Sequence, residues 1–205
     1  MRKMISSEKI RTWVRAAKPW VAGIAILVVL RYTGLLSGIS NLGGTTIMKT
    51  GAMDYEPAKA SRKEVFDYNF SIKDLKGNAI DFNKFKDKVI FLNLWATWCG
   101  PCRMEMPSIQ TLYSGIADKD NVVFVMLSLD RDSHREKVVQ FVESGAYTFP
   151  VYMPSGSLPE LLQVPSIPTT FIISPDGEVA SKNVGAANYD NDKVKKFLED
   201  LKTKR

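Results

Sequence analysis

The chain has 205 residues, of which 45 % are hydrophobic, 24 % charged and 10 % aromatic. This composition is typical of a globular domain and excludes a wholly disordered chain. The net charge of +6 belongs to the first 60 residues, because residues 61–205 carry nineteen basic and nineteen acidic side chains. The C-terminal part therefore offers no basic surface for a nucleic-acid partner, and we expect none.

A basic segment followed by an apolar run opens the chain. Residues 1–18 hold six Lys or Arg against Glu8, and residues 19–30 are uncharged. The roughly 20 helical residues that cross a bilayer are reached when the run continues to Ile39, with Arg31 extending toward an interface. The alternatives are a cleaved secretory signal and a helix that does not span. No small-x-small cleavage site follows the run closely, which disfavours the signal.

These features predict four regions. They are a basic cytoplasmic segment at 1–18, a transmembrane anchor at 19–40, a linker without sustained periodicity at 41–61 and a folded domain at 62–205. Because cytoplasmic flanks carry the excess of Lys and Arg, the folded domain is expected outside the cytoplasm. We therefore expect a single-pass protein of the inner (cytoplasmic) membrane, with its domain in the periplasm or otherwise outside the cell interior.

Strand and helix patterns alternate from Val65 onward. Two stretches around the turn at 73–77 predict a hairpin, and continuous apolar runs predict strands buried on both faces. After the hairpin the expected order is a strand at 88–95, a helix from about 101 to 116 that Pro107 kinks, a strand at 121–129, a helix at 133–145, a strand at 149–153, a short helix at 159–164, strands at 169–174 and 178–184, and a helix at 188–204. This order predicts an α/β fold with a mixed central sheet flanked by helices.

Residues 98–102 read WCGPC and contain the only two cysteines, Cys99 and Cys102. A structural zinc site needs four ligands, and the one histidine, His134, stands in a charged helical stretch. We therefore expect no metal and place His134 on the surface. A disulfide between residues three apart constrains little chain entropy. Thiol redox chemistry fits the pair better, and it requires no cofactor beyond the two sulfurs.

The cysteine pair stands where a buried strand ends and a helix begins. Unpaired backbone N–H groups and the positive end of the helix dipole favour a thiolate there. On this geometry Cys99 is the exposed attacking sulfur, and Cys102, one turn deeper, resolves a mixed disulfide. Gly100 and Pro101 set the turn, and a proline at the helix start sacrifices no needed donor. Trp98 offers a flat apolar rim to a partner.

WCGPC matches the active-site motif of the thioredoxin superfamily, which the chain resembles over about residues 62–205. A second stretch, VPSIPTTF at 164–171, resembles the loop in which this superfamily places a cis-proline facing the disulfide. The resemblance implies a thioredoxin fold with an N-terminal hairpin extension. It also implies that Pro168 is the cis-proline and that the backbone around Ile167 and Thr169 binds substrate as a short strand.

Two positions are similar to the TlpA/ResA branch of membrane-anchored, extracytoplasmic thiol-disulfide oxidoreductases. Asn93 stands where thioredoxin has a buried aspartate, and Glu105 stands where it has an apolar residue. A shielded carboxylate one turn beyond Cys102 has a raised pKa and can pass protons as the thiols open and close. The alternative for Glu105 is a surface residue paired with Arg103. Asn93 is expected to be buried and hydrogen-bonded but not catalytic.

The resemblance implies an enzyme that cycles Cys99 and Cys102 between dithiol and disulfide. Its expected substrates are protein disulfides, with cytochrome c apoprotein thiols among those of the family, and a membrane-embedded donor is expected to supply electrons. One alternative is a peroxiredoxin-like thiol peroxidase, whose P-x-x-x-T-x-x-C pattern requires Pro and Thr where this chain has Leu92 and Ala96. The other is a non-catalytic binding module with the same fold, against which the intact WCGPC argues.

Overall fold

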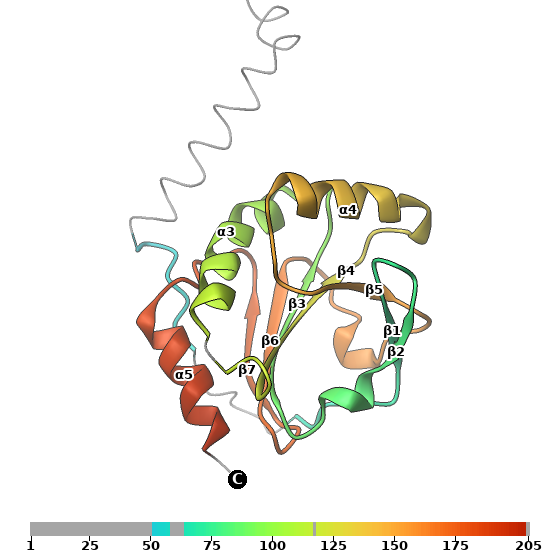
Figure 1. Cartoon of the computed structure of the whole chain (residues 1–205). Coiled ribbons are helices and arrows are strands. Elements are labelled where there is room, and N and C mark those ends of the chain that lie inside the picture. The colour runs from blue at the N-terminus through green and yellow to red at the C-terminus, as the bar shows by residue number, and fades with distance from the viewer. Residues whose placement is uncertain (1–50, 58–63, 117, 204–205) are drawn as a thin grey trace, which may run out of the picture. The chain divides into compact units, whose positions relative to one another are not determined.

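A seven-stranded mixed sheet forms the centre of the computed structural model (Figure 1). Its strands are β1 Ser71–Asp74, β2 Ala79–Asp81, β3 Val89–Trp95, β4 Val122–Ser128, β5 Val151–Pro154, β6 Thr169–Ile173 and β7 Val179–Val184. The strand order is β2-β1-β5-β4-β3-β6-β7. β4 is parallel to its neighbours β3 and β5, and all other neighbouring pairs are antiparallel. The predicted mixed sheet and the hairpin ahead of β3 are confirmed.

The structure describes three stretches of the chain, residues 51–57, 64–116 and 118–203. The predicted basic segment, 1–18, and the predicted anchor, 19–40, lie outside the described residues. Among the residues that are described, no helix combines the length and the apolar character needed to cross a membrane. The anchor therefore stays a prediction.

The helices occupy the positions in the chain that the sequence predicts, with two differences. The α-helices of the described part are α3 Gly100–Gly115, α4 Arg135–Ser144 and α5 Asp192–Lys202, and the 3-10 helices are η1 Phe82–Phe85, η2 Asp132–His134 and η3 Glu160–Leu162. α5 begins later than the predicted residue 188, because the Asn191 side chain caps it by accepting from the Val194 N–H at 3.0 Å. The short helix predicted at 159–164 is a single 3-10 turn.

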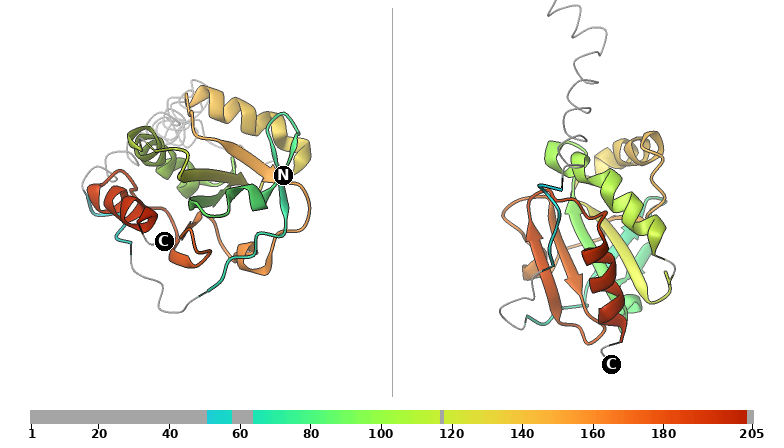
Figure 2. Two further views of the ribbon diagram at one scale, coloured as in Figure 1. Left: turned by 60° about the horizontal axis from the view of Figure 1, so that its bottom comes forward. Right: turned by 90° about the vertical axis from the view of Figure 1, so that its left-hand side faces the viewer.

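Side chains of β3 alternate between two hydrophobic cores, one on each face of the sheet. Phe91 and Trp95 join the core under α3 and α5, and these helices lie side by side over that face (Figures 1 and 2). Leu92 and Leu94 join the other core, which η1, η3 and residues 66–72 help to form. Each fully buried side chain of this size stabilises the fold by about 1.5–3 kcal/mol. The end of β3, where WCGPC follows, is therefore firmly fixed.

Part of the predicted linker, 41–61, packs on the domain instead of running free. Tyr55 is only 8 % exposed and belongs to the core under α3 and α5. Its backbone N–H donates to the Asn188 carbonyl at 2.9 Å, and the Asn188 N–H donates to the Met53 carbonyl at 2.7 Å. One aromatic side chain and one isolated bridge leave no repeating pattern in the sequence, which is why periodicity did not reveal this contact.

Candidate active site

The two cysteines lie at the first turn of α3, directly beyond the buried strand β3. Cys99 is the N-cap residue of the helix, and its sulfur accepts a hydrogen bond from the Cys102 N–H at 3.2 Å. The two residues are joined by a disulfide, with their Cα atoms 5.3 Å apart. Gly100 and Pro101 occupy the exposed start of the helix between them. The predicted strand, turn and helix arrangement around WCGPC is therefore present.

The two sulfurs are less exposed than the sequence suggested. Cys102 is fully buried and Cys99 is only 5 % exposed, so the prediction of an openly exposed Cys99 needs correction. The reason is the neighbouring loop, whose Ile167 carbonyl oxygen lies 3.7 Å from the Cys99 sulfur. Trp98, in contrast, is 70 % exposed. The disulfide therefore presents little surface to solvent and lies beside an exposed indole ring.

The loop that faces the disulfide carries the predicted cis-proline. The Ile167–Pro168 peptide bond is cis, Ile167 is half-buried and Pro168 is buried. Thr169 is fully buried, and its hydroxyl donates to the Ser166 carbonyl at 2.8 Å. The Thr169 side chain therefore holds the loop in place and does not face a partner. Substrate binding by the backbone of this loop stays a prediction.

Glu105 lies inside the protein and does not pair with Arg103 at the surface. Its side chain is fully buried, and burial raises the pKa of the carboxyl to about 8 against the opposing effect of two hydrogen bonds. One comes from the Asn93 amide nitrogen at 2.8 Å, and the other from the Ala187 backbone N–H at 3.2 Å. Such a group exchanges its proton close to neutral pH, so it can serve thiol chemistry one helical turn away.

A chain of uncharged polar groups supports the carboxyl from the sheet. Asn93 on β3 and Thr170 on β6 are paired in register, and the Asn93 amide nitrogen also donates to the Thr170 hydroxyl at 2.9 Å. The Tyr189 hydroxyl donates to the same Thr170 oxygen at 2.8 Å. The prediction that Asn93 is a buried hydrogen-bonding residue is confirmed, and its partners fix the position of Glu105.

A buried carboxylate also anchors the segment just before the cysteines. Asp130 accepts two hydrogen bonds from Thr97, one from its backbone N–H at 2.8 Å and one from its hydroxyl at 2.6 Å. The Ser128 hydroxyl donates to the same carboxylate at 2.8 Å. These contacts tie the stretch entering WCGPC to the end of β4, and they orient the backbone that leads into Cys99.

Sequence reasoning missed several supporting residues of this site. Thr170 and Asp130 carried a signal, since each is a polar residue inside or directly after a predicted buried strand. Tyr189 carried a weaker one, because an aromatic residue just before a C-terminal helix often packs beneath it. Ala187 carried none, because it contributes a backbone N–H group that every residue type except proline possesses.

Comparison with known proteins agrees with this geometry. A family model described as Redoxin matches residues 63–201 of the chain. The chain is 33 % identical over 169 residues to the thioredoxin-like protein YneN of Bacillus subtilis, covering 82 % of this chain and 91 % of that protein. It is also 33 % identical over 182 residues to the thiol-disulfide oxidoreductase ResA of Oceanobacillus iheyensis, covering 86 % of each chain.

Solved structures show the same fold. The thiol:disulfide interchange protein DsbE of Chlorobium tepidum superposes with a TM-score of 0.51 and 26 % identity, covering 72 % of this chain and 95 % of that one. A thiol-disulfide oxidoreductase of Bacteroides vulgatus gives a TM-score of 0.56 and 26 % identity, covering 69 % and 99 %. With its disulfide at the start of α3, the chain belongs to the redoxin family and is a ResA-like thiol-disulfide oxidoreductase of the thioredoxin superfamily.

Proposed function

We propose that this oxidoreductase reduces protein disulfides outside the cytoplasm through a dithiol-disulfide cycle of Cys99 and Cys102. The observation that carries the proposal is the joint placement of three groups: the cysteine pair at a helix N-terminus, the Ile167 carbonyl 3.7 Å from the outer sulfur, and the buried carboxyl of Glu105. This arrangement supplies an attacking thiolate, a backbone for the substrate to pair with and a proton acceptor.

The cycle has two displacement steps. The Cys99 thiolate attacks one sulfur of the substrate disulfide, which forms a mixed disulfide and releases the first substrate thiolate. The Cys102 thiolate then attacks the Cys99 sulfur, which forms the enzyme disulfide and releases the second substrate thiolate. The substrate gains two electrons and two protons, and the enzyme dithiol loses them. A dithiol reductant must restore the enzyme, and in this proposal that reductant is a membrane-embedded partner.

Glu105 accepts the Cys102 proton in the second step. Cys102 is fully buried, so its thiol has no direct contact with bulk water and needs an internal base. A carboxyl whose pKa is raised by burial to about 8 is a stronger base than an ordinary glutamate. Its ionised form can therefore take up the proton of a neighbouring thiol. Glu105 therefore makes the resolving thiolate available without leaving a permanent charge in the core.

Replacement of each cysteine tests the assignment. Reduction of insulin disulfides by the full-length protein should be abolished in Cys99→Ser and in Cys102→Ser. The two variants should differ in one respect, because only Cys102→Ser retains the attacking sulfur and should accumulate a mixed disulfide with the substrate. Unchanged insulin reduction in Cys99→Ser would support a binding module instead, and peroxide consumption without a disulfide substrate would support a peroxidase.

The direction of the reaction follows from the reduction potential of the pair. Among C-x-x-C proteins the potentials run from about −270 mV in thioredoxin to about −120 mV in the oxidant DsbA. The Gly100-Pro101 dipeptide, which thioredoxin shares, favours the reducing end. Equilibration of the full-length protein with dithiothreitol buffers should therefore give a value near the lower limit. A value near −120 mV would reverse the assignment and make the enzyme a donor of disulfides.

The proposed location in the cell follows from the predicted anchor at 19–40. A domain outside the cytoplasm meets disulfides that the cytosol keeps reduced, and a reductase there needs electrons delivered across the membrane. The names of the relatives, ResA in Oceanobacillus iheyensis among them, support a protein of this type. By the same likeness, disulfides formed between the thiols of cytochrome c apoproteins are the substrates that we propose first.

A further inference from the structure

The segment Met53–Glu56, here called the strap, pairs with the backbone of the domain at one residue, Asn188. The Tyr55 N–H donates to the Asn188 carbonyl at 2.9 Å, and the Asn188 N–H donates to the Met53 carbonyl at 2.7 Å. The Asn188 side-chain amide donates to the Asp54 carboxylate at 2.6 Å. Both backbone groups and the side chain of Asn188 are thus used by the strap.

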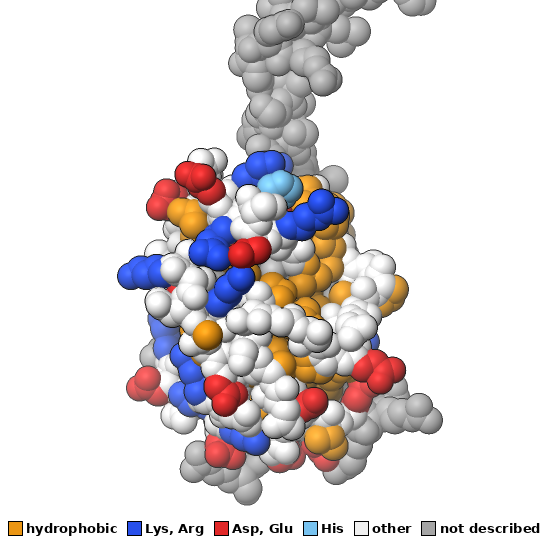
Figure 3. Space-filling view, turned by 90° about the vertical axis from the view of Figure 1, so that its right-hand side faces the viewer, with side chains coloured by type: hydrophobic (Ala, Val, Ile, Leu, Met, Phe, Trp, Pro, Cys, Tyr) orange, Lys and Arg blue, Asp and Glu red, His pale blue; other side chains and the backbone are white. Residues whose placement is uncertain are grey.

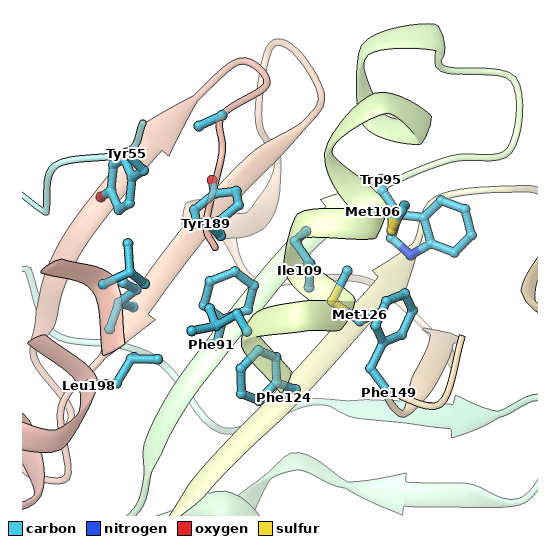
Figure 4. Packing of buried hydrophobic residues seen from close by; sticks show 14 of the residues in the cluster. Tyr55, Phe91, Trp95, Met106, Ile109, Phe124, Met126, Phe149, Tyr189 and Leu198 are labelled. Carbon is cyan, nitrogen blue, oxygen red and sulfur yellow. The ribbon is translucent and has the colours of Figure 1, made fainter. Parts of the chain in front are cut away.

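Tyr55 adds a buried anchor to these bonds. Its ring packs against that of Tyr189 with centroids 5.3 Å apart, and its hydroxyl shares a hydrogen bond of 2.6 Å with the Ser181 hydroxyl. Figure 4 shows Tyr55 coming from the N-terminal segment and lying beside Tyr189, next to Phe91 of the sheet. At the exposed end of the strap, Glu56 forms an ion pair with Lys193 of α5.

The backbone N–H groups on either side of Asn188 point the other way, toward α3. The Ala187 N–H donates to Glu105 Oε2 at 3.2 Å, and the Tyr189 N–H donates to the Ser108 hydroxyl of α3 at 3.2 Å. This alternation is the behaviour of an extended backbone, in which successive residues face opposite sides. The pairing of Asn188 with the strap is therefore one of the contacts that hold the Ala187 N–H group toward Glu105.

We propose that the strap is a positioning element for catalysis: by pairing with Asn188, it keeps the Ala187 N–H group on the carboxyl of Glu105. The inference rests on the proposed function, in which Glu105 accepts the Cys102 proton. Residues ahead of the catalytic domain thereby take part in its proton chemistry. Tyr55 and Asp54 act through Asn188 and touch neither substrate nor sulfur.

The groups around Glu105 set the direction of the effect. The titratable groups that face Glu105 are the Cys102 thiol of α3 in the reduced enzyme and the Tyr189 phenol, whose pKa burial raises well above its ordinary value. β3 and β6 present only the uncharged Asn93 and Thr170. The Ala187 N–H bond stabilises the ionised carboxylate and lowers the pKa of Glu105. Loosening the strap therefore raises the pKa of Glu105.

The test is the pH profile of insulin reduction by the full-length chain in detergent. In the wild type the rate should rise with a midpoint near the Glu105 pKa of about 8, and Glu105→Gln should remove that rise. Tyr55→Ala should move the midpoint upward by about half a unit, which is about a threefold lower rate at pH 7. In the Glu105→Gln background, Tyr55→Ala should not change the profile further.

Two matched controls separate positioning from loss of stability. Tyr68 is 7 % exposed against 8 % for Tyr55, and it lies in the core on the opposite face. Tyr68→Ala should therefore cost similar stability and leave the midpoint unchanged. At the exposed end, Asp54→Ala removes the acceptor for the Asn188 amide and should shift the midpoint upward, whereas Asp54→Asn keeps an acceptor oxygen and should not.

The outcomes distinguish a failure of the proposed role of Glu105 from a failure of the strap proposal. If Glu105→Gln keeps the wild-type midpoint, the proton role of Glu105 fails and the strap inference falls with it. If Glu105→Gln abolishes the rise but Tyr55→Ala and Asp54→Ala keep the wild-type midpoint, only the strap inference is overturned. The same holds if Tyr68→Ala moves the midpoint as far as Tyr55→Ala does. Should Tyr55→Ala not fold, the Asp54 pair alone decides.

Discussion

Glu105 is the residue at which stability and activity compete. A buried carboxylate is costly unless it is paired with a cation, and its hydrogen-bond partners, the Asn93 amide and the Ala187 N–H, are both uncharged. The Asn93 side-chain oxygen, meanwhile, is buried without a hydrogen-bond partner among the described residues. A neutral, protonated Glu105 avoids the free-energy cost of an unpaired buried charge. The site therefore favours the protonated form until pH rises to about 8.

This preference predicts a pH-dependent effect of Glu105→Gln on stability. The folded-state pKa of about 8 lies above the ordinary glutamate value of 4.5, so the stability from burying the neutral acid is complete below pH 4.5 and is lost as pH rises through 8. Glutamine is neutral at every pH. As the pH rises from 4.5 to 8, we expect the free energy of unfolding of Glu105→Gln to increase relative to that of the wild type by on the order of 2–5 kcal/mol. Urea unfolding at each pH measures this difference.

The control for this prediction is an exposed glutamate on another helix. Glu143→Gln on α4 removes the same charge from an exposed position and should change the free energy of unfolding by less than about 0.5 kcal/mol. A stability difference between wild type and Glu105→Gln that stays constant from acid to alkaline pH would contradict the raised pKa.

The residues of the site could be predicted from the sequence where their chemistry belongs to a side chain. Cys99, Cys102 and Pro168 followed from their spacing and from the resemblance to a family. Whether Glu105 lies at the surface or in the core could not be decided, because position i+3 from Cys102 fixes a helix face only after the packing of that face is known. The role of the Ala187 N–H group could not be predicted, because nearly every residue type has a backbone N–H group.

At the scale of elements, the hairpin β6–β7 holds the cis-proline loop from behind. β6 pairs with β3 on one side and with β7 on the other, and the Gly185 N–H donates to the Pro168 carbonyl at 2.9 Å. The turn of this hairpin needs Gly177, whose φ is +80°. A side chain at such a φ costs about 1–2 kcal/mol.

Gly177→Ala is therefore expected to lower the free energy of unfolding by about 1–2 kcal/mol, and Tm by several degrees. The added methyl group meets the Tyr68 ring at 3.5 Å, an ordinary contact, so the backbone conformation alone accounts for the loss. The matched control is Gly156→Ala, where the added methyl group meets nothing within 4 Å and φ is not positive. Thermal unfolding of both variants checks the prediction, and equal losses would refute it.

Elements with a strong pattern were predictable and those without one were not. β3 and β4 lie within one residue of their predicted bounds, because an unbroken apolar run has few ways to be buried. The helix predicted from 188 failed at its start, since Asn188 and Tyr189 are held in an extended backbone by contacts with a distant segment. The docking of the strap could not be predicted for the same reason, because its partner lies more than 130 residues away in the chain.

At the scale of the whole molecule, the surface of the folded domain carries no charge of dominant sign. Figure 3 shows Lys, Arg, Asp and Glu side chains interspersed on one face, beside a strip of hydrophobic side chains. This agrees with equal numbers of acidic and basic residues in 61–205. Long-range electrostatic steering of a substrate is therefore weak, and recognition must depend on contacts close to the disulfide.

Topology is a prediction for the whole molecule, and single cysteines can test it. In a background of Cys99→Ser and Cys102→Ser, a membrane-impermeant maleimide should label Ser144→Cys in cells whose outer envelope is permeabilised. It should label Ser7→Cys only after the inner membrane is broken. The physical reason is the basic segment 1–18, which stays on the cytoplasmic side. Labelling in the opposite order would overturn the proposed orientation, and loss of residue 7 from the mature protein would indicate cleavage.

If the proposed anchor is present, the docked strap also limits how far the domain can extend from the bilayer. With an anchor ending at residue 40, a linker running to residue 61 spans at most about 70 Å when fully extended. Because the chain is already seated on the domain at Met53, the free length ends near residue 52, and the limit falls to about 40 Å. In the proposed membrane-anchored topology, this length keeps the disulfide near the membrane surface. We then expect its clients to be membrane-bound proteins or chains emerging from the bilayer.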